Sequence, residues 1–160
     1  MQGFEITEDL LSKEDDQLNA RPCVTGIAQF HPKAESNEAD CYGNRKSYVC
    51  KLYFTYPLKL MVPKYAGSSN TQWLYPITYG GGLVAGDHID LDVTVGDGCS
   101  VLITTQGSTK VYKSVNNLIS MQGIDAKVNN GGLLAILPDP VVCYQNARYA
   151  QTQVWLIETQ

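Results

Sequence analysis

The sequence lacks long apolar runs, an excess of basic residues and a recognisable leader. No stretch of its 160 residues approaches the roughly 20 consecutive apolar residues that a membrane-spanning helix needs. The first residues, MQGFEITEDLLSKEDD, are acidic and have neither the basic start nor the apolar stretch of a secretory signal. The net charge of −4 does not suit a nucleic acid or an anionic membrane as partner. We therefore expect a cytoplasmic protein that binds neither.

Cysteines are few and widely spaced. The chain has five, an odd number with no Cys-x-x-Cys pair: Cys23, Cys41, Cys50, Cys99 and Cys143. A disulfide framework or a structural zinc site would show a tighter pattern. The sequence therefore predicts buried free thiols in a reducing compartment.

Histidines are scarcer still, and no catalytic motif accompanies them. His31 and His88 are the only two. A catalytic nucleophile needs a base beside it, and the hydroxyl residues Thr104, Thr105 and Ser108 lack a Gly-x-Ser-x-Gly context. The sequence therefore favours a binding protein over an enzyme.

The residues that are present form a β pattern. Turn signals recur about every ten residues and no long helical period occurs, which is typical of an all-β fold. Residues 1–20 form an acidic tail that is either disordered or holds a short helix over 7–18, and residues 21–160 form the β domain. Strands are expected at 24–30, on both sides of Pro57 within 47–62, and at 73–78, 88–95, 100–105, 110–114, 118–128, 133–137, 141–144 and 152–157.

The clearest strand is 88–95, where polar and apolar residues alternate strictly. A period of two places its apolar side chains, Ile89, Leu91, Val93 and Val95, on one face. The turn Gly96-Asp97-Gly98 follows, and residues 100–105 suit a returning strand. We therefore expect an antiparallel hairpin.

The polar face of the same strand carries His88, Asp90 and Asp92. An imidazole and two carboxylates at this spacing could bind a divalent metal ion. The solvated face of an antiparallel strand would look the same in the sequence, and the alternation favours that interpretation. A small metal-binding protein or metal-dependent enzyme using these residues remains an alternative.

The glycine-rich run Tyr79-Gly80-Gly81-Gly82-Leu83-Val84-Ala85-Gly86-Asp87 resembles a phosphate loop at first sight. Asp87 and His88 stand where such a loop has its lysine and hydroxyl residue, and a carboxylate there would repel a phosphate. A β pattern follows in place of a helix. The glycines therefore shape a turn, which Asp87 can fix by accepting backbone N–H bonds.

The chain ends within an apolar run, Val154-Trp155-Leu156-Ile157. A strand of this kind at a sheet edge exposes unpaired backbone groups to other chains. We expect that the sequence is the front part of a larger domain.

Two blocks of sequence resemble the urease accessory protein family UreD, called UreH in some bacteria. The first is Thr78 to Asp87, with its Gly-Gly-Gly run, followed by Val95-Gly96-Asp97-Gly98-Cys99. The second is Leu102 to Ser114, LITTQGSTKVYKS. The resemblance covers roughly Val24 to Trp155, in a form closer to eukaryotic members.

The resemblance implies an all-β, β-helix-like or stacked-sheet scaffold with a few short helices and no catalytic site. It implies a urease maturation chaperone that binds a UreF-like protein, through it the GTPase UreG, and apo-urease. No cofactor would be bound tightly, and Ni²⁺ would pass in transit. The chain is shorter than usual for the family, so a non-functional truncated form is a further alternative.

Site residues follow from these arguments. Asp87 and His88 could line a path for Ni²⁺, since a carboxylate is a serviceable weak ligand. The remaining motif residues are expected to serve structure more than partner contact: Gly80, Gly81, Gly82, Gly86, Thr104, Thr105, Gln106, Lys110 and Tyr112.

Overall fold

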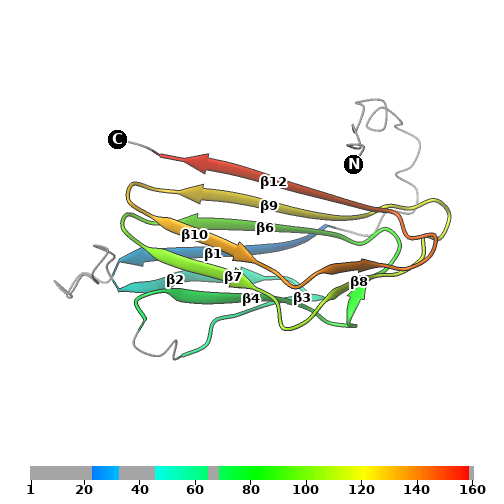
Figure 1. Cartoon of the computed structure of the whole chain (residues 1–160), viewed down its shortest axis with the longest axis horizontal. Helices are drawn as coiled ribbons and strands as arrows, with labels where there is room; N and C mark the ends of the chain where they lie inside the picture. Colours follow the sequence, from blue (N-terminus) through cyan, green and yellow to red (C-terminus); the bar gives the residue numbers. More distant parts are fainter. Residues whose placement is uncertain (1–22, 33–45, 65–68, 159–160) are drawn as a thin grey trace.

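The strands wind into a parallel β-solenoid, as Figure 1 shows for this computed structural model. The structure describes residues 23–32, 46–64 and 69–158. Twelve strands lie in these ranges: β1 Val24–Pro32, β2 Ser47–Phe54, β3 Leu58–Met61, β4 Gln72–Thr78, β5 Gly82–Leu83, β6 His88–Val95, β7 Ser100–Thr104, β8 Thr109–Val111, β9 Ser120–Val128, β10 Leu133–Leu137, β11 Val141–Cys143 and β12 Tyr149–Ile157. The all-β prediction is confirmed.

Three sheets form the sides of the winding. They have the strand orders β12-β9-β6-β1-β2, β10-β7-β4-β3 and β11-β8-β5. One turn of the winding, a coil, is β6-β7-β8; the next is β9-β10-β11, and β12 begins a third. Each strand pairs in parallel with its equivalent one coil later, as Leu91 does with Ile124. The solenoid therefore stacks coils that repeat about every 33 residues, the separation of those two positions.

Antiparallel strands close the N-terminal end of the stack. β1 pairs in parallel with β6 on one side and antiparallel with β2 on the other. β3 pairs antiparallel with β4, and the Tyr56-Pro57 peptide bond between β2 and β3 is cis. The predicted break at Pro57 is confirmed, because β2 ends at Phe54 and β3 begins at Leu58.

The predicted hairpin between residues 88–95 and 100–105 is wrong. β6 and β7 belong to different sheets, and Gly96-Asp97-Gly98 forms a corner of the coil. The equivalent corner of the next coil lies directly against it. The amide of Gly98 donates a hydrogen bond to the carbonyl of Asn130 in that corner, at 2.9 Å. Glycine-rich turn chemistry suits both arrangements, and the partner strand decides between them.

The core lies inside the coils. The four apolar residues of β6, from Ile89 to Val95, are at most 4% exposed, which confirms the predicted inward face. Phe30 and Leu74 are fully buried beside them. At the other end of the stack β12 is an edge strand with an exposed apolar surface, and Leu156 and Ile157 are 59% and 61% exposed.

Two other expectations concern helices and cysteines. Among the described residues there is no helix, so none could cross a membrane; the helix considered for residues 7–18 lies outside them. The prediction of buried thiols holds only for Cys99, because Cys23, Cys50 and Cys143 are exposed, although all four are free. Cys41 lies outside the described residues.

Candidate functional site

The glycine run forms a tight passage from β4 to β6 that only glycine fits. Gly80 and Gly81 have φ angles of 99° and 73°, in the left-handed region that disfavours a side chain. Gly82 lies in β5, pressed against the backbone carbonyl of Lys110 in β8, so a Cβ would collide with it. The turn therefore depends on glycine for both conformation and space.

Asp87 closes this turn and links it to the next coil. Its Oδ2 accepts a hydrogen bond from the amide of Val84 at 2.9 Å, and its own amide donates to the carbonyl of Val84 at 3.0 Å. The carbonyl of Asp87 also accepts from the amide of Met121 at the start of β9, at 2.7 Å. These bonds match the role in fixing the turn that the sequence predicts.

The second motif block lies directly beside the glycine turn. Thr105 and Gln106 line a cavity of about 170 Å³ together with Gly81 and Gly82. The two sequence blocks, about 25 residues apart along the chain, therefore meet in space. β5 and β8 hold them together by pairing Gly82 with Lys110.

The threonines of this block bind the following coil. Thr104 Oγ1 donates to the carbonyl of Leu137 at 2.8 Å. Thr105 Oγ1 donates to Oδ2 of Asp139 at 2.9 Å and accepts from the Asp139 amide at 2.8 Å. These hydrogen bonds connect one coil to the corner of the next coil, so the two threonines stabilise the stack.

A second cavity, of about 430 Å³, joins aromatic and polar residues. Tyr56 and Tyr79 form one wall, with their rings stacked at a centroid separation of 5.9 Å. Asp87 and His88 contribute polar groups to the lining. The two residues that the sequence offered as metal contacts therefore line one cavity.

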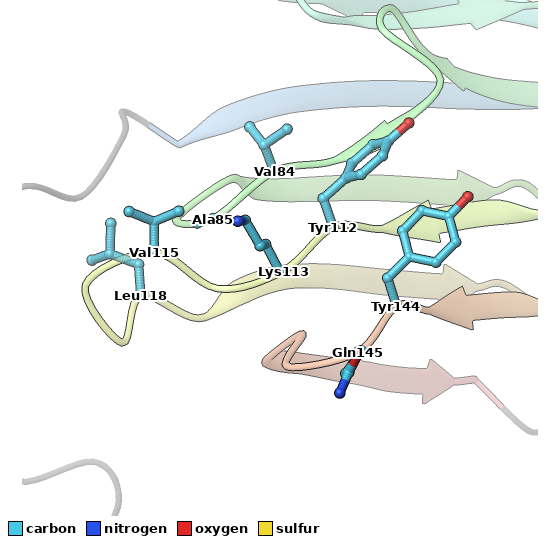
Figure 2. Close-up of a pocket in the computed structure, with 8 residues that line it drawn as sticks. All are labelled: Val84, Ala85, Tyr112, Lys113, Val115, Leu118, Tyr144 and Gln145. Atoms are coloured by element: carbon cyan, nitrogen blue, oxygen red, sulfur yellow. The ribbon is translucent and has the colours of Figure 1, made fainter.

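An apolar groove of about 850 Å³ lies at the neighbouring corner of the coils (Figure 2). Tyr112 follows β8 and Tyr144 follows β11, and their rings lie side by side with centroids 5.4 Å apart. Val115 and Leu118 line the far part of the groove. The aromatic pair joins equivalent positions of successive coils, so Tyr112 is part of the stack as well as of this surface.

One side-chain cluster combines three kinds of metal ligand. Cys23 Sγ, the His88 imidazole and an Asp90 carboxylate oxygen lie within 4.8 Å of one another. Asp90 Oδ2 is 3.2 Å from Cys23 Sγ and 3.3 Å from His88 Nε2. Burial and the hydrogen bond to Asp90 raise the pKa of the Cys23 thiol. Asp90 Oδ2 therefore accepts the hydrogen bond from the Cys23 thiol and lies close to His88 Nε2 at the same time.

Asp92 lies outside the cluster. Its register partner on β9 is Asp125. Burial, followed by the charges of Asp125 and Asp90, raises the pKa of the Asp92 carboxyl. The expected set of His88, Asp90 and Asp92 is therefore corrected, with Cys23 in the place of Asp92. The sequence carried no signal for Cys23, because only the parallel pairing of β1 with β6 brings it beside His88.

Comparison with known proteins identifies the family of this sequence. The profile of the family described as "UreD urease accessory protein" matches residues 37–160. The chain belongs to the UreD family. Relatives named "Urease accessory protein D" from Oryza sativa subsp. indica and Arabidopsis thaliana are 52% and 45% identical to this UreD-family chain, over 69% of its length. A Schizosaccharomyces pombe relative, "Uncharacterized urease accessory protein ureD-like", is 38% identical over 71% of the chain.

The UreD-family chain corresponds to part of these relatives. The matched stretches span 37%, 38% and 39% of the rice, Arabidopsis and fission yeast proteins. The family match includes the glycine turn, the threonine block and both residues of β6 in the metal-ligand cluster. Cys23 precedes the matched range.

Proposed function

We propose that this chain supplies part of a urease maturation scaffold, on which apo-urease receives nickel. The match of residues 37–160 to the UreD urease accessory protein family carries the proposal. The relatives' names refer to urease accessory proteins. The scaffold binds a UreF-like protein, and a UreG-like GTPase joins through that partner. Nickel is the cargo, and the chain needs no tightly bound cofactor.

The geometry of the glycine turn supports a scaffold that does not bind the nucleotide itself. A phosphate loop leads into a helix N-terminus, whose amides bind the anion. Here the turn leads into strand β6, and Asp87 places a carboxylate beside the turn amide of Val84. GTP chemistry therefore belongs to the partner, and this chain contributes surface and shape.

Asp87 and His88 are the residues that we propose as nickel contacts in transit. They line the cavity of about 430 Å³, and a carboxylate with an imidazole suits Ni²⁺ as a weak, exchangeable pair of ligands. Transit requires weak binding, because a tight site would retain the ion. We do not propose that the chain catalyses a reaction.

Co-purification tests the proposal directly. The tagged chain is expressed with a UreF-like and a UreG-like protein, each alone and both together. We expect UreF-like protein to co-purify with the chain, and UreG-like protein to do so only when the UreF-like protein is present. Failure of the UreF-like protein to bind, together with full urease activity after deletion of the gene, would overturn the proposal.

The nickel route has a separate test. Asp87→Asn keeps an oxygen that can accept the bond from Val84 but removes the negative charge. Nickel bound per urease is measured in cells that express the wild-type chain or the variant at matched levels. We expect lower nickel content with Asp87→Asn, and equal content would exclude Asp87 from the route.

A further inference from the structure

We propose that Cys23, His88 and Asp90 form a binding site for a divalent first-row transition metal ion, where the residue before β1 lies beside the first residues of β6. The geometry of these three side chains carries the proposal without the maturation role, although His88 also lines the cavity of the proposed nickel route. Two of them, His88 and Asp90, have side chains about 40% exposed, at 37% and 42%. An ion in solution can therefore reach the cluster directly.

The donor set selects the type of ion. A thiolate, an imidazole and a carboxylate suit borderline ions such as Zn²⁺, Co²⁺ and Ni²⁺, whereas Ca²⁺ and Mg²⁺ prefer oxygen ligands alone. On binding, the Cys23 thiol loses its proton to solvent and its sulfur bonds to the ion. Water completes the coordination, because three protein ligands leave at least one position open.

The present distances already suit such an ion. Bonds of about 2.0–2.3 Å in a tetrahedron place neighbouring ligand atoms roughly 3.3–3.7 Å apart. The two distances from Asp90 Oδ2, to Cys23 Sγ and His88 Nε2, are 3.2 and 3.3 Å. All three ligand atoms lie within 4.8 Å of one another. Small side-chain rotations would therefore place an ion among them.

The arrangement disfavours a nucleophilic role for the thiol. In a catalytic Cys-His-Asp group the imidazole lies between the thiol and the carboxylate, so that it can take the thiol proton. Here Asp90 lies between the other two, since its Oδ2 contacts both Cys23 and His88. A metal ion bound among the three groups would replace the thiol proton.

The neighbouring strand β9 leaves room for the Asp90 side chain. Gly123 is its register partner, and the Asp90 carboxylate fills the place where a Cβ at position 123 would stand. Gly123 has no left-handed φ angle, so its conformation would accept alanine. An alanine there should displace Asp90 while all three ligands remain in the sequence. Gly123 is therefore a positioning residue for this site.

Metal titration of the full chain tests the proposal. Co²⁺ is the probe, because a cobalt–thiolate bond gives a charge-transfer absorption band in the near ultraviolet; calorimetry with Zn²⁺ and Ni²⁺ gives affinities. We expect one ion per chain and a thiolate band with Co²⁺. Cys23→Ser should abolish the band, and His88→Ala and Asp90→Asn should each weaken binding by about tenfold or more.

Matched controls separate the cluster from the chain's other ligands. Cys50 is an exposed free thiol and His31 an exposed imidazole, both away from the cluster. Cys50→Ser and His31→Ala should leave the affinity unchanged, and circular dichroism verifies that each variant is folded. Gly123→Ala should weaken binding by about tenfold, as loss of a positioning residue does. Absence of the cobalt–thiolate band, or equal losses in the ligand and control variants, would overturn the proposal.

Discussion

Replacing Asp87 by alanine or asparagine separates two proposed roles of the residue: fixing the glycine turn by a hydrogen bond, and contacting nickel by its charge. Its carboxylate accepts the amide of Val84 at 2.9 Å in a partly buried turn. A hydrogen bond to a charged acceptor contributes about 1.5–3 kcal/mol to stability, and one between neutral groups about 0.5–1.5 kcal/mol. Partial exposure places this bond toward the lower end of the first range.

We therefore expect Asp87→Ala to lower the free energy of unfolding by about 1.5 kcal/mol, since it leaves the Val84 amide without this acceptor. Asp87→Asn should lose about half as much, because its amide oxygen can still accept the bond. Equilibrium urea denaturation, followed by tryptophan fluorescence, measures both. The midpoint should shift while the slope stays constant, as a change in native-state stability requires.

Two results would refute this reasoning. Equal destabilisation by both variants would mean that charge, and not the hydrogen bond, fixes the turn. No change in either would mean that glycine conformation alone fixes it. If Asp87→Asn is nearly as stable as wild type yet lowers nickel content in urease, the charge acts on the ion and the bond acts on the fold.

Three further predictions concern the stack. Gly82→Ala should destabilise the chain by about 1–3 kcal/mol, because the new Cβ collides with the β8 backbone. Gly107→Ala should be nearly neutral, because there is open space around Gly107. Equal effects of the two variants in urea denaturation would contradict this. A double-mutant cycle on Tyr112 and Tyr144 should give a coupling of about 0.5–1.5 kcal/mol, and additive losses would show that the ring contact contributes nothing. Burial and neighbouring carboxylates raise the pKa of Asp92 above its ordinary value of 3.8, so its stabilising protonated form is lost as pH rises through the folded-state pKa. Asp92→Asn should therefore be more stable than wild type at pH about 7, with the difference gone below pH 3.8. A stability difference that does not change with pH would refute the assignment.

The strands and their inward faces could be predicted from sequence because alternation is a local property. The polar and apolar residues of β6 alternate over eight positions, and the buried side chains are those expected. The strand partners could not be predicted in this way. Gly96-Asp97-Gly98 marks a reversal of some kind, but its chemistry suits a hairpin and a solenoid corner equally. The parallel partner of Ile89 is Gln122, far beyond the reach of a local pattern.

The same distinction between local patterns and long-range pairing applies to the residues of the candidate site. Asp87 and the glycines could be predicted because a turn and its closing carboxylate are neighbours in sequence. Cys23 could not, since 65 residues separate Val24 from its register partner Ile89. The exposure of Cys50 was also missed: a free cysteine is usually buried, but most of strand β2, which carries it, faces outward.

The parallel register of the solenoid also bears on the speed of folding. Pairing β6 with β9 closes a loop of 33 residues, and pairing β1 with β6 closes one of 65. Doubling a loop costs only about 0.6 kcal/mol in closure entropy, so the two pairings begin on nearly equal terms. Both need long-range contacts, and chains dominated by such contacts fold in about milliseconds to seconds. Refolding started by rapid dilution from urea should therefore take milliseconds to seconds, and a microsecond phase with full amplitude would contradict this.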